Sequence, residues 1–544
     1  MELFLAFVVA LTVTAARIPV LARWAPAIGL TDAPGPRKVH SVPVPRVGGL
    51  AMAAGVMLPT IVSVSLVPEI RGLLLALVVL LLFGVWDDRV TLGYRTKLAG
   101  QLIAVAICML VGGLHIGALS FWGHSLPPEA GTAITFVFLV GITNAVNLAD
   151  GLDGLAGGMV LLCLCAIAIF ATMSGNIPVT SVALIEAGAV LGFLRFNTHP
   201  ARIFMGDSGS QMLGLSVGAL GLLATQGDTC VLSAALPLLL LGLPIMDTLA
   251  VMWTRIRAGR SPFAADRNHL HHRLLSLGFA HREAVLIIYV MQATLVLLAY
   301  FLRFESDAEV ILSYGLFAFS VLWVLRRALL TGWKVREIAP EGAPAATVAT
   351  SPARTRIPAL AVGVMTACLV VYAAIVIGSS ERVRGDLGLT CAGLLLVLLL
   401  MTYWKGRQRS ILWFERGMAY VGVLLLVYLD QTVPHKALLL STLSWTCIAI
   451  TGSAALIRFW VSPARRFEVT TLDLIVIFIS LVMPNLPGLV ALPADLPAGV
   501  AKSVILLYVV ELLLSVDLKR TAPRLLLGAL LAVIAGRALL DAGT

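Results

Sequence analysis

The sequence predicts an all-α fold, a polytopic bundle of transmembrane helices. Of its 544 residues, 59% are hydrophobic and only 12% are charged, which excludes an ordinary soluble domain. Apolar runs of about 20 residues, long enough to cross roughly 30 Å of hydrocarbon as a helix, recur from end to end. These runs are rich in Leu, Val, Ala and Ile and lack the alternation of barrel strands, so the spans should be helices.

The apolar runs divide the chain into three parts. About eleven spans are expected in a core of residues 1–325 and about seven in a module of residues 358–544. Between them, residues 326–357 contain a basic cluster and an Ala/Pro/Thr-rich stretch typical of a cytoplasmic linker. The expected core spans lie near 1–22, 48–67, 72–86, 98–114, 132–149, 155–173, 178–194, 209–225, 230–253, 284–302 and 309–325.

Basic residues lie mainly on alternate loops of the core. The odd-numbered loops carry most of the Lys and Arg residues, which places those loops in the cytoplasm and the N-terminus outside. The net charge of +10 is accounted for by these helix ends, and no basic stripe with interleaved aromatic residues is present. We therefore expect no nucleic-acid partner.

The second odd loop begins with two adjacent carboxylates, Asp87 and Asp88, followed by Arg89 and Lys97. Neighbouring carboxylates at a membrane boundary are costly unless a cation or a proton is shared between them. A solvated helix end is the alternative explanation for this pair taken alone.

The third loop carries four oxygen-bearing side chains at intervals of three residues: Asn144, Asn147, Asp150 and Asp153. On a helical turn this spacing would align them along one face. Apolar spans flank them on both sides, so they would be expensive as lipid-facing residues. The spacing therefore indicates a ligand-binding function.

The fourth loop contains Phe204 and Asp207, and Asp207 is expected to open the next helix. A carboxylate there could simply cap the helix, because the helix dipole favours negative charge at an N-terminus. Together with the other two loops, however, it completes a set of carboxylate and amide oxygens suited to Mg²⁺, for which Mn²⁺ is expected to substitute.

Two further loops offer cations to phosphates. The first odd loop is stiffened by prolines and presents Lys38 and Arg46, although a basic loop that only sets topology is the alternative. The fifth odd loop presents its Arg and His residues in the run Asp-Arg-Asn-His-Leu-His-His: Arg267, His269, His271 and His272. Such donors suit a diphosphate. Zinc is disfavoured at this histidine run because its spacing lacks separated ligands. A divalent ion and phosphates at a membrane surface indicate phosphoryl transfer.

In order along residues 30–282, these segments resemble the polyprenyl-phosphate N-acetylhexosamine-1-phosphate transferase superfamily (glycosyltransferase family 4). They are closer to its GlcNAc-1-phosphate branch than to its muramoyl-pentapeptide branch. The motifs are DAPGPRKVH with PRVGG, DDR with a following Lys, NAVNLADGLDGL, FMGDSGS and DRNHLHH. The resemblance covers about the first half of the chain.

The resemblance implies a role for each of these residues. Asp207 and Asn147 would hold Mg²⁺, Asp87 and Asp88 would act at the reaction centre, and Lys97 would contact phosphate. Asp153 and Phe204 would belong to a uracil pocket with Asp150 beside it, and the basic residues of the fifth loop would grip the sugar diphosphate.

The expected reaction is attack of a polyprenyl phosphate on the β-phosphorus of a UDP-sugar, with release of UMP. Direct attack and a covalent aspartyl intermediate both remain open. The expected location is a bacterial inner membrane, with the active-site loops in the cytoplasm. Further expected partners are a second copy of the chain and, through residues 358–544, downstream glycan-assembly enzymes. A transporter or flippase is the alternative class, and it predicts polar residues near mid-span rather than at one membrane face.

Overall fold

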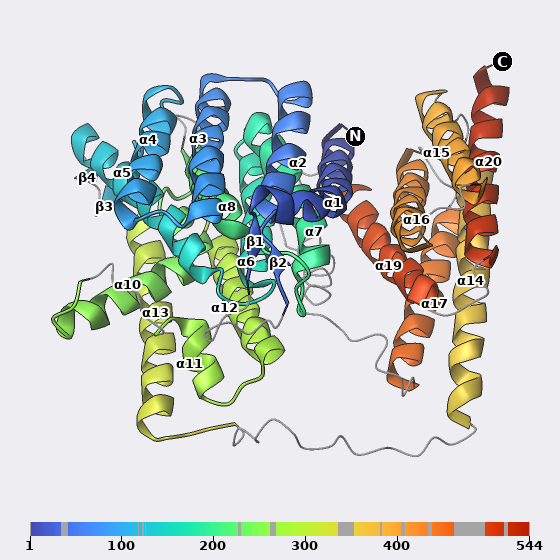
Figure 1. Ribbon diagram of the computed structural model, residues 1–544. Coiled ribbons are helices and arrows are strands. Elements are labelled where there is room, and N and C mark those ends of the chain that lie inside the picture. Colours follow the sequence, from blue (N-terminus) through green and yellow to red (C-terminus); the bar gives the residue numbers. More distant parts are fainter. Residues whose placement is uncertain are drawn as a thin grey trace. The chain divides into compact units, whose positions relative to one another are not determined.

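The computed structural model describes most of the chain as helices arranged in two compact units (Figure 1). The described residues are 2–33, 42–117, 119–121, 124–125, 127–226, 230–261, 268–335, 353–380, 383, 385–403, 408–432, 438–461, 495–515 and 521–542. The first unit contains α1–α13 and the second contains α14–α20. The predicted residues Lys38 and Arg267 lie outside the described residues.

The first unit is built almost entirely from helices. Its helices are α1 (Glu2–Ile28), α2 (Gly48–Ser63), α3 (Pro68–Val90), α4 (Tyr94–Leu110), α5 (Pro128–Ala149), α6 (Leu155–Met173), α7 (Ile177–Asn197), α8 (Gly206–Thr225), α9 (Leu236–Leu240), α10 (Gly242–Arg257), α11 (Leu270–Ser276), α12 (His281–Phe301) and α13 (Asp307–Leu330). Two short antiparallel pairs accompany them: β1 (Thr31–Asp32) with β2 (Val44–Pro45), and β3 (Ser120–Phe121) with β4 (His124–Ser125).

Local sequence signals account for several helix starts. Pro68 and Pro128 begin α3 and α5, where a missing N–H costs nothing. The Asn176 side chain accepts a hydrogen bond from the Val179 amide and caps α7. These signals agree with the spans predicted from hydropathy.

Helices α6 and α8 form the centre of the first unit and are buried along most of their length. Helix α6 packs against α7, while α3 and α5 pack against α8. Helices that are apolar on every side are expected in such positions. Among the described residues, eight helices are long and apolar enough to cross a membrane. The predicted polytopic helical bundle is confirmed, and the number of spans stays a prediction.

The predicted span over 230–253 is two helices rather than one. The chain breaks between α9 and α10 at Leu241, which lacks helical backbone angles. Figure 1 shows α10 running across the direction of α12 and α13. The short helix α11, which carries His271 and His272, also lies in a stretch with no predicted span.

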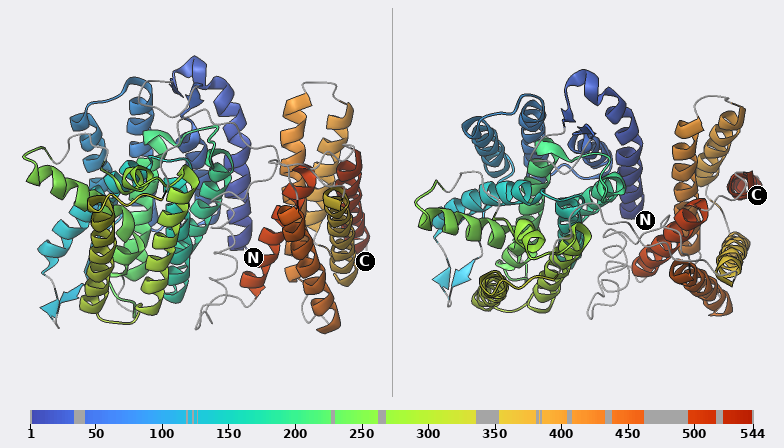
Figure 2. Two further views of the ribbon diagram at one scale, coloured as in Figure 1. Left: turned by 90° about the horizontal axis from the view of Figure 1, so that it is seen from below. Right: turned by 60° about the horizontal axis from the view of Figure 1, so that its bottom comes forward.

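The second unit consists of helices (Figure 2), and buried apolar side chains give it a hydrophobic core of its own. Its described helices are α14 (Ala353–Ser379), α15 (Gly385–Tyr403), α16 (Gln408–Thr432), α17 (Leu438–Val461), α19 (Asp495–Ser515) and α20 (Thr521–Ala542). Within it, the Lys502 ammonium lies 2.5 Å from Oδ2 of Asp430 and 4.7 Å from the centre of the Trp445 ring. Both charged residues are buried, so α16 and α19 are joined by an ion pair inside the bundle.

Candidate active site

A cavity of about 480 Å³ lies where five polar segments of the first unit meet. The predicted residues that line it are Arg46, Asp88, Asn147, Asp150, Asp153, Phe204, Asp207 and His272. The other lining residues are Asp32, Gly151, Leu152, Asn197, His199, Pro200, Ala201, Gly206 and His281. The structure therefore brings residues from all five predicted loops to one cavity, and Asp87 and Lys97 of the second loop adjoin it through Asp207.

Lys97 joins two of the predicted carboxylates. Its ammonium lies 2.5 Å from Oδ2 of Asp87 and 2.9 Å from Oδ2 of Asp207. Burial favours the neutral amine, but the two carboxylates outweigh this effect and raise the pKa of Lys97, which stays charged. A cation of the chain itself thus already bridges the two carboxylates.

Asp88 holds the beginning of α8. Its Oδ1 accepts the Asp207 amide at 2.9 Å, and its Oδ2 accepts the Ser208 amide at 3.1 Å and the Ser208 hydroxyl at 2.8 Å. A carboxylate that receives the first amides of a helix satisfies donors that the helix itself cannot. Asp88 therefore positions Asp207, whereas its neighbour Asp87 faces Lys97.

Two glycines allow this approach of α3 to α8. A Cβ on Gly84 would lie 2.3 Å from Cα of Ser208, so only glycine lets the helices come this close. Gly206 has a φ of 74°, and a Cβ there would lie 2.4 Å from Oδ2 of Asp88. Glycine at positions 84 and 206 thus leaves room for the Asp88 carboxylate at the start of α8.

Asn147 lies against Asp207. Its amide nitrogen donates to Oδ1 of Asp207 at 2.6 Å and to the Ser210 hydroxyl at 2.8 Å. Since the nitrogen makes both bonds, the carbonyl oxygen is the atom that Asn147 can offer to a cation.

Asn144 lies one turn earlier on α5, is partly buried, and belongs to a network of side-chain amides. It exchanges hydrogen bonds with Gln101 at 2.7 and 3.2 Å, and Gln101 also donates to Gln211 at 3.2 Å. This network ties α4, α5 and α8 together beneath Asn147. Asn144 does not line the cavity, so its predicted contact with substrate gains no support from the geometry.

The three-residue spacing does not run along one helix face throughout. Helix α5 ends at Ala149, so Asp150 caps it and Asp153 lies in the turn before α6. Both nevertheless line the cavity. Burial, together with the carboxylates of Asp207, Asp88 and Asp153, raises the pKa of Asp150 to about 7.

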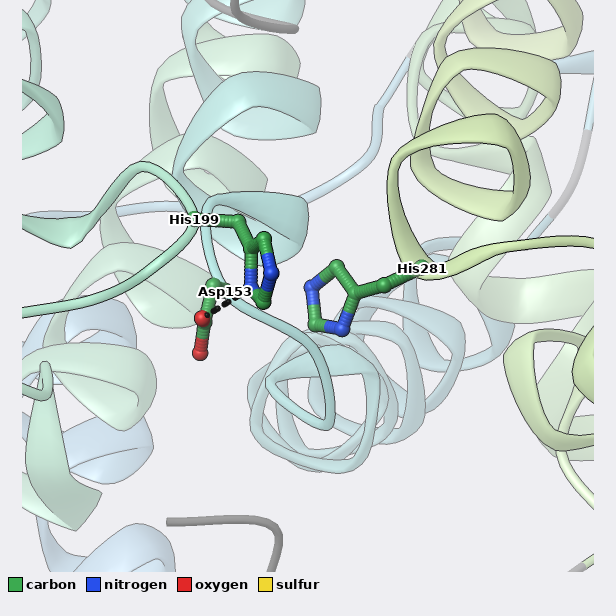
Figure 3. Close-up of side chains that lie close together, drawn as sticks. All are labelled: Asp153, His199 and His281. Atoms are coloured by element: carbon green, nitrogen blue, oxygen red, sulfur yellow. Dashed lines mark hydrogen bonds and ion pairs between the residues drawn. The ribbon is translucent and has the colours of Figure 1, made fainter. Parts of the chain in front are cut away.

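Asp153, His199 and His281 gather at one part of the cavity (Figure 3). Oδ2 of Asp153 lies 2.7 Å from Nδ1 of His199 and accepts the Ala201 amide at 3.0 Å. The rings of His199 and His281 stack with centroids 4.2 Å apart. These groups come from the α5–α6 turn, the α7–α8 loop and the first residue of α12.

Phe204 and Arg46 are linked through the backbone. The Phe204 amide donates to the Pro45 carbonyl at 2.8 Å, and the Gly48 amide donates to the Phe204 carbonyl at 3.0 Å. The Arg46 guanidinium pairs with Asp32. The described end of the first loop is thus fixed against the loop before α8, and Arg46 reaches the cavity.

The three predicted histidines of the fifth loop lie in different surroundings. His269 is buried and lies 2.9 Å from Oδ2 of Asp247, while His271 is buried against the backbone at Gly151. Burial, reinforced by the nearby His272, lowers the pKa of His271 to about 4. Only His272 of the three lines the cavity, so the geometry supports direct contact with substrate for His272 and a supporting position for the other two.

Comparisons with known proteins show which proteins this chain resembles. Residues 70–225 match the model of glycosyl transferase family 4. A probable undecaprenyl-phosphate N-acetylglucosaminyl 1-phosphate transferase of Bacillus subtilis is 37% identical over 295 residues, which are 53% of this chain and 82% of that protein. The chain belongs to glycosyl transferase family 4.

Other relatives agree with this assignment. The decaprenyl-phosphate N-acetylglucosaminephosphotransferase of Mycolicibacterium smegmatis is 38% identical, with 48% of this chain and 72% of that protein covered. The undecaprenyl-phosphate alpha-N-acetylglucosaminyl 1-phosphate transferase of Salmonella typhi is 30% identical, with 57% and 86% covered. The resemblance seen in the motifs is confirmed, and this family 4 chain is a multi-pass membrane protein.

Several polar residues in and around this site were not predicted from the sequence. Gln101 follows Lys97 by one helical turn inside an apolar run, and a polar residue there is a signal in itself. His199 and Asn197 stand in the same loop as Phe204, where the sequence predicts only Phe204 and Asp207 as site residues. His281 adjoins an apolar run, and nothing in the sequence relates it to His199.

Proposed function

We propose that this chain transfers GlcNAc-1-phosphate from UDP-GlcNAc to undecaprenyl phosphate, the first step in assembling a cell-envelope glycan. Two of the relatives named above are described as undecaprenyl-phosphate N-acetylglucosaminyl 1-phosphate transferases. The single observation that supports it most is the Asp87–Lys97–Asp207 ion-pair chain beside a polar cavity. Such a cluster suits a transfer in which charge on a diphosphate must be neutralised.

In the proposed reaction, an oxygen of the lipid phosphate forms a bond to the β-phosphorus of the UDP-sugar. The bond from that phosphorus to the bridging oxygen breaks, and the electron pair leaves with UMP. A phosphate monoester is largely dianionic at neutral pH, so the nucleophile needs little help from a base. Asp87 and Lys97 would orient the reacting phosphates, and Asp88 would act by positioning Asp207.

Magnesium belongs to this proposal as the cofactor. The donors fit it, since Asp207 and Asn147 offer hard oxygen atoms and the Lys97 ammonium already lies against the same carboxylate. When bound, Mg²⁺ would neutralise charge on the diphosphate and on the departing UMP. Mn²⁺ is proposed to substitute. The chain's own contribution is to hold those oxygens in place through Asp88 and Ser210.

The cavity loops are proposed to face the cytoplasm of a bacterial inner membrane. The described cavity residues stand at helix ends or in short loops, and the basic residues of the core favour the same side. A transporter predicts a polar path near mid-span instead.

The decisive experiment uses the purified full chain with Mg²⁺, undecaprenyl phosphate and a panel of UDP-sugars. UMP release and formation of a lipid-diphosphate sugar are expected with UDP-GlcNAc. The muramoyl-pentapeptide nucleotide should give no product. If no UDP-sugar yields UMP while the protein remains folded and metal-competent, the transferase proposal is wrong.

For the module of residues 358–544, docking of downstream enzymes and pairing with a second chain stay predictions. The alignment with the Bacillus subtilis relative covers only 53% of this chain, so a transferase core does not require the whole sequence. A chain ended after Leu330 should therefore retain transfer activity. Loss of transfer in a well-folded truncated protein would give the module a part in catalysis.

A further inference from the structure

The cluster of Asp153, His199 and His281 has the composition of a transition-metal site. One carboxylate and two imidazoles are common ligands of zinc, which in proteins often has three side-chain ligands and one open position. Each residue offers a ligand atom, and these atoms all lie within 4.8 Å of one another. Hard oxygen donors dominate around Asp207, whereas imidazole nitrogens dominate here.

The three ligands come from separate, well-anchored segments. Asp153 is held by the Ala201 amide, and His199 stands in the loop that Asn197 fixes through its bonds to the Gly154 amide and the Ile203 carbonyl. His281 is the first residue of α12. Ligands separated along the chain but adjacent in space make a site that the sequence alone does not display.

The electrostatics of the cavity favour a cation there. Five carboxylates line it, from Asp32, Asp88, Asp150, Asp153 and Asp207. Among the described lining residues, Arg46 is the one Lys or Arg, and its side chain is paired with Asp32. The side chains of His199 and Asp153 are 33% and 20% exposed, so an ion from solution can reach them.

We propose that Asp153, His199 and His281 bind a zinc-like transition-metal ion at a site separate from that of Asp207. The bound ion would compete with the nucleotide sugar for the cavity. The ion would replace the proton shared between Asp153 and Nδ1 of His199. Zinc–ligand distances near 2.0–2.1 Å place tetrahedral ligands about 3.3 Å apart, so the His281 ring moves inward by roughly 1 Å from its stacked position. The fourth position faces the cavity.

Competition with substrate rests on the proposed function, because it requires Asp153 to be shared with the nucleotide. The metal site itself does not rest on it. Zinc at this site would raise the apparent KM for the UDP-sugar without lowering kcat, and excess nucleotide would relieve the inhibition.

The test measures zinc bound to the full chain in detergent after chelator treatment, with Co²⁺ absorption as a second probe. One zinc per chain is expected for the wild type, and binding at least tenfold weaker for His281→Ser and for His199→Gln. His281→Cys should restore binding, because a thiolate is a zinc ligand, whereas a structural role would not distinguish Cys from Ser.

Two controls locate the ion. His115→Gln changes an exposed histidine bonded to the Gly113 carbonyl and should leave zinc binding unchanged. Asp207→Asn should retain zinc while losing Mn²⁺. Equal zinc binding in the Ser and Cys variants, or zinc lost with His269→Gln and kept by His281→Ser, would overturn the proposal. Zinc content is measured without turnover, so its outcome is independent of whether transfer occurs.

Discussion

The Lys97 ammonium lies 2.9 Å from Oδ2 of Asp207, although the two residues are 110 positions apart in the sequence. Lys97 precedes the apolar part of α4 and Asp207 begins α8, so the contact joins two helix starts at one end of the first unit. The reactivity of the site should therefore depend on Asp207 more than on any other carboxylate.

Replacing Asp207 with Asn should lower kcat at least about a hundredfold and abolish the response to Mg²⁺, because a charged oxygen ligand is lost. The protein should still insert and elute as a folded species, since Asn keeps the size of the side chain. UMP release over a Mg²⁺ titration measures the effect. Near-normal turnover would remove Asp207 from the metal site.

The adjacent carboxylates Asp87 and Asp88 should differ in their effects, the first on turnover and the second on stability. Asp88→Ala should lower the free energy of unfolding by about 1–3 kcal/mol, because two amides at the start of α8 lose their acceptor. Asp87→Asn should instead reduce turnover with little effect on thermal unfolding. Parallel melting and activity measurements in detergent compare the two, and equal melting losses would contradict the division of roles.

Gly206→Ala should destabilise the protein by more than about 1 kcal/mol, since an L residue is strained at this φ and its Cβ would collide with Asp88. Gly141→Ala is the matched control, because its Cβ would meet nothing within 4 Å in the exposed middle of α5. That change should be neutral or slightly stabilising. Similar melting temperatures for the two variants would refute the close fit.

His271 predicts a pH effect on stability. Its pKa in the folded protein is about 4, below the ordinary 6.5, so its contribution is complete above pH 6.5 and is lost as the pH falls towards 4. Asp150, with a raised pKa, acts in the opposite direction over the same range, so the comparison must be with His271→Gln. The advantage of the wild type over this variant should shrink by about 3 kcal/mol at most between pH 7 and 4.

The measurement is thermal unfolding of both proteins at several pH values. A constant difference across the range would show that His271 is not held neutral by its burial.

In the second unit, Lys502→Met should destabilise the fold by about 3–5 kcal/mol, because it leaves the Asp430 carboxylate buried without its cation. The double variant Asp430→Leu/Lys502→Met should recover much of that loss. Unfolding of the full chain, followed by denaturant titration, gives the coupling between the two positions. Additive losses would mean that the pair contributes little.

The sequence predicted the class of fold and about half of the residues that line the cavity, because span lengths and polar loops are local properties. It could not separate Asp87 from Asp88, since their roles depend on how closely α3 approaches α8 at Gly84. It also could not foresee that Asp150 and Asp153 lie beyond the end of α5 and still line the cavity, or that His199 and His281 would stack. Those features arise from packing between distant segments, which no local pattern encodes.

The bonds from Asp88 to the first turn of α8 bear on how ligands bind. Asp88 holds the first turn of α8 in the absence of a ligand, which opposes fraying. Asp207 and the hydroxyl of Ser208 therefore occupy fixed positions. An incoming ion or diphosphate then loses little affinity to ordering the protein. Tight inhibitors of this chain should accordingly be rigid molecules that match a preorganised surface.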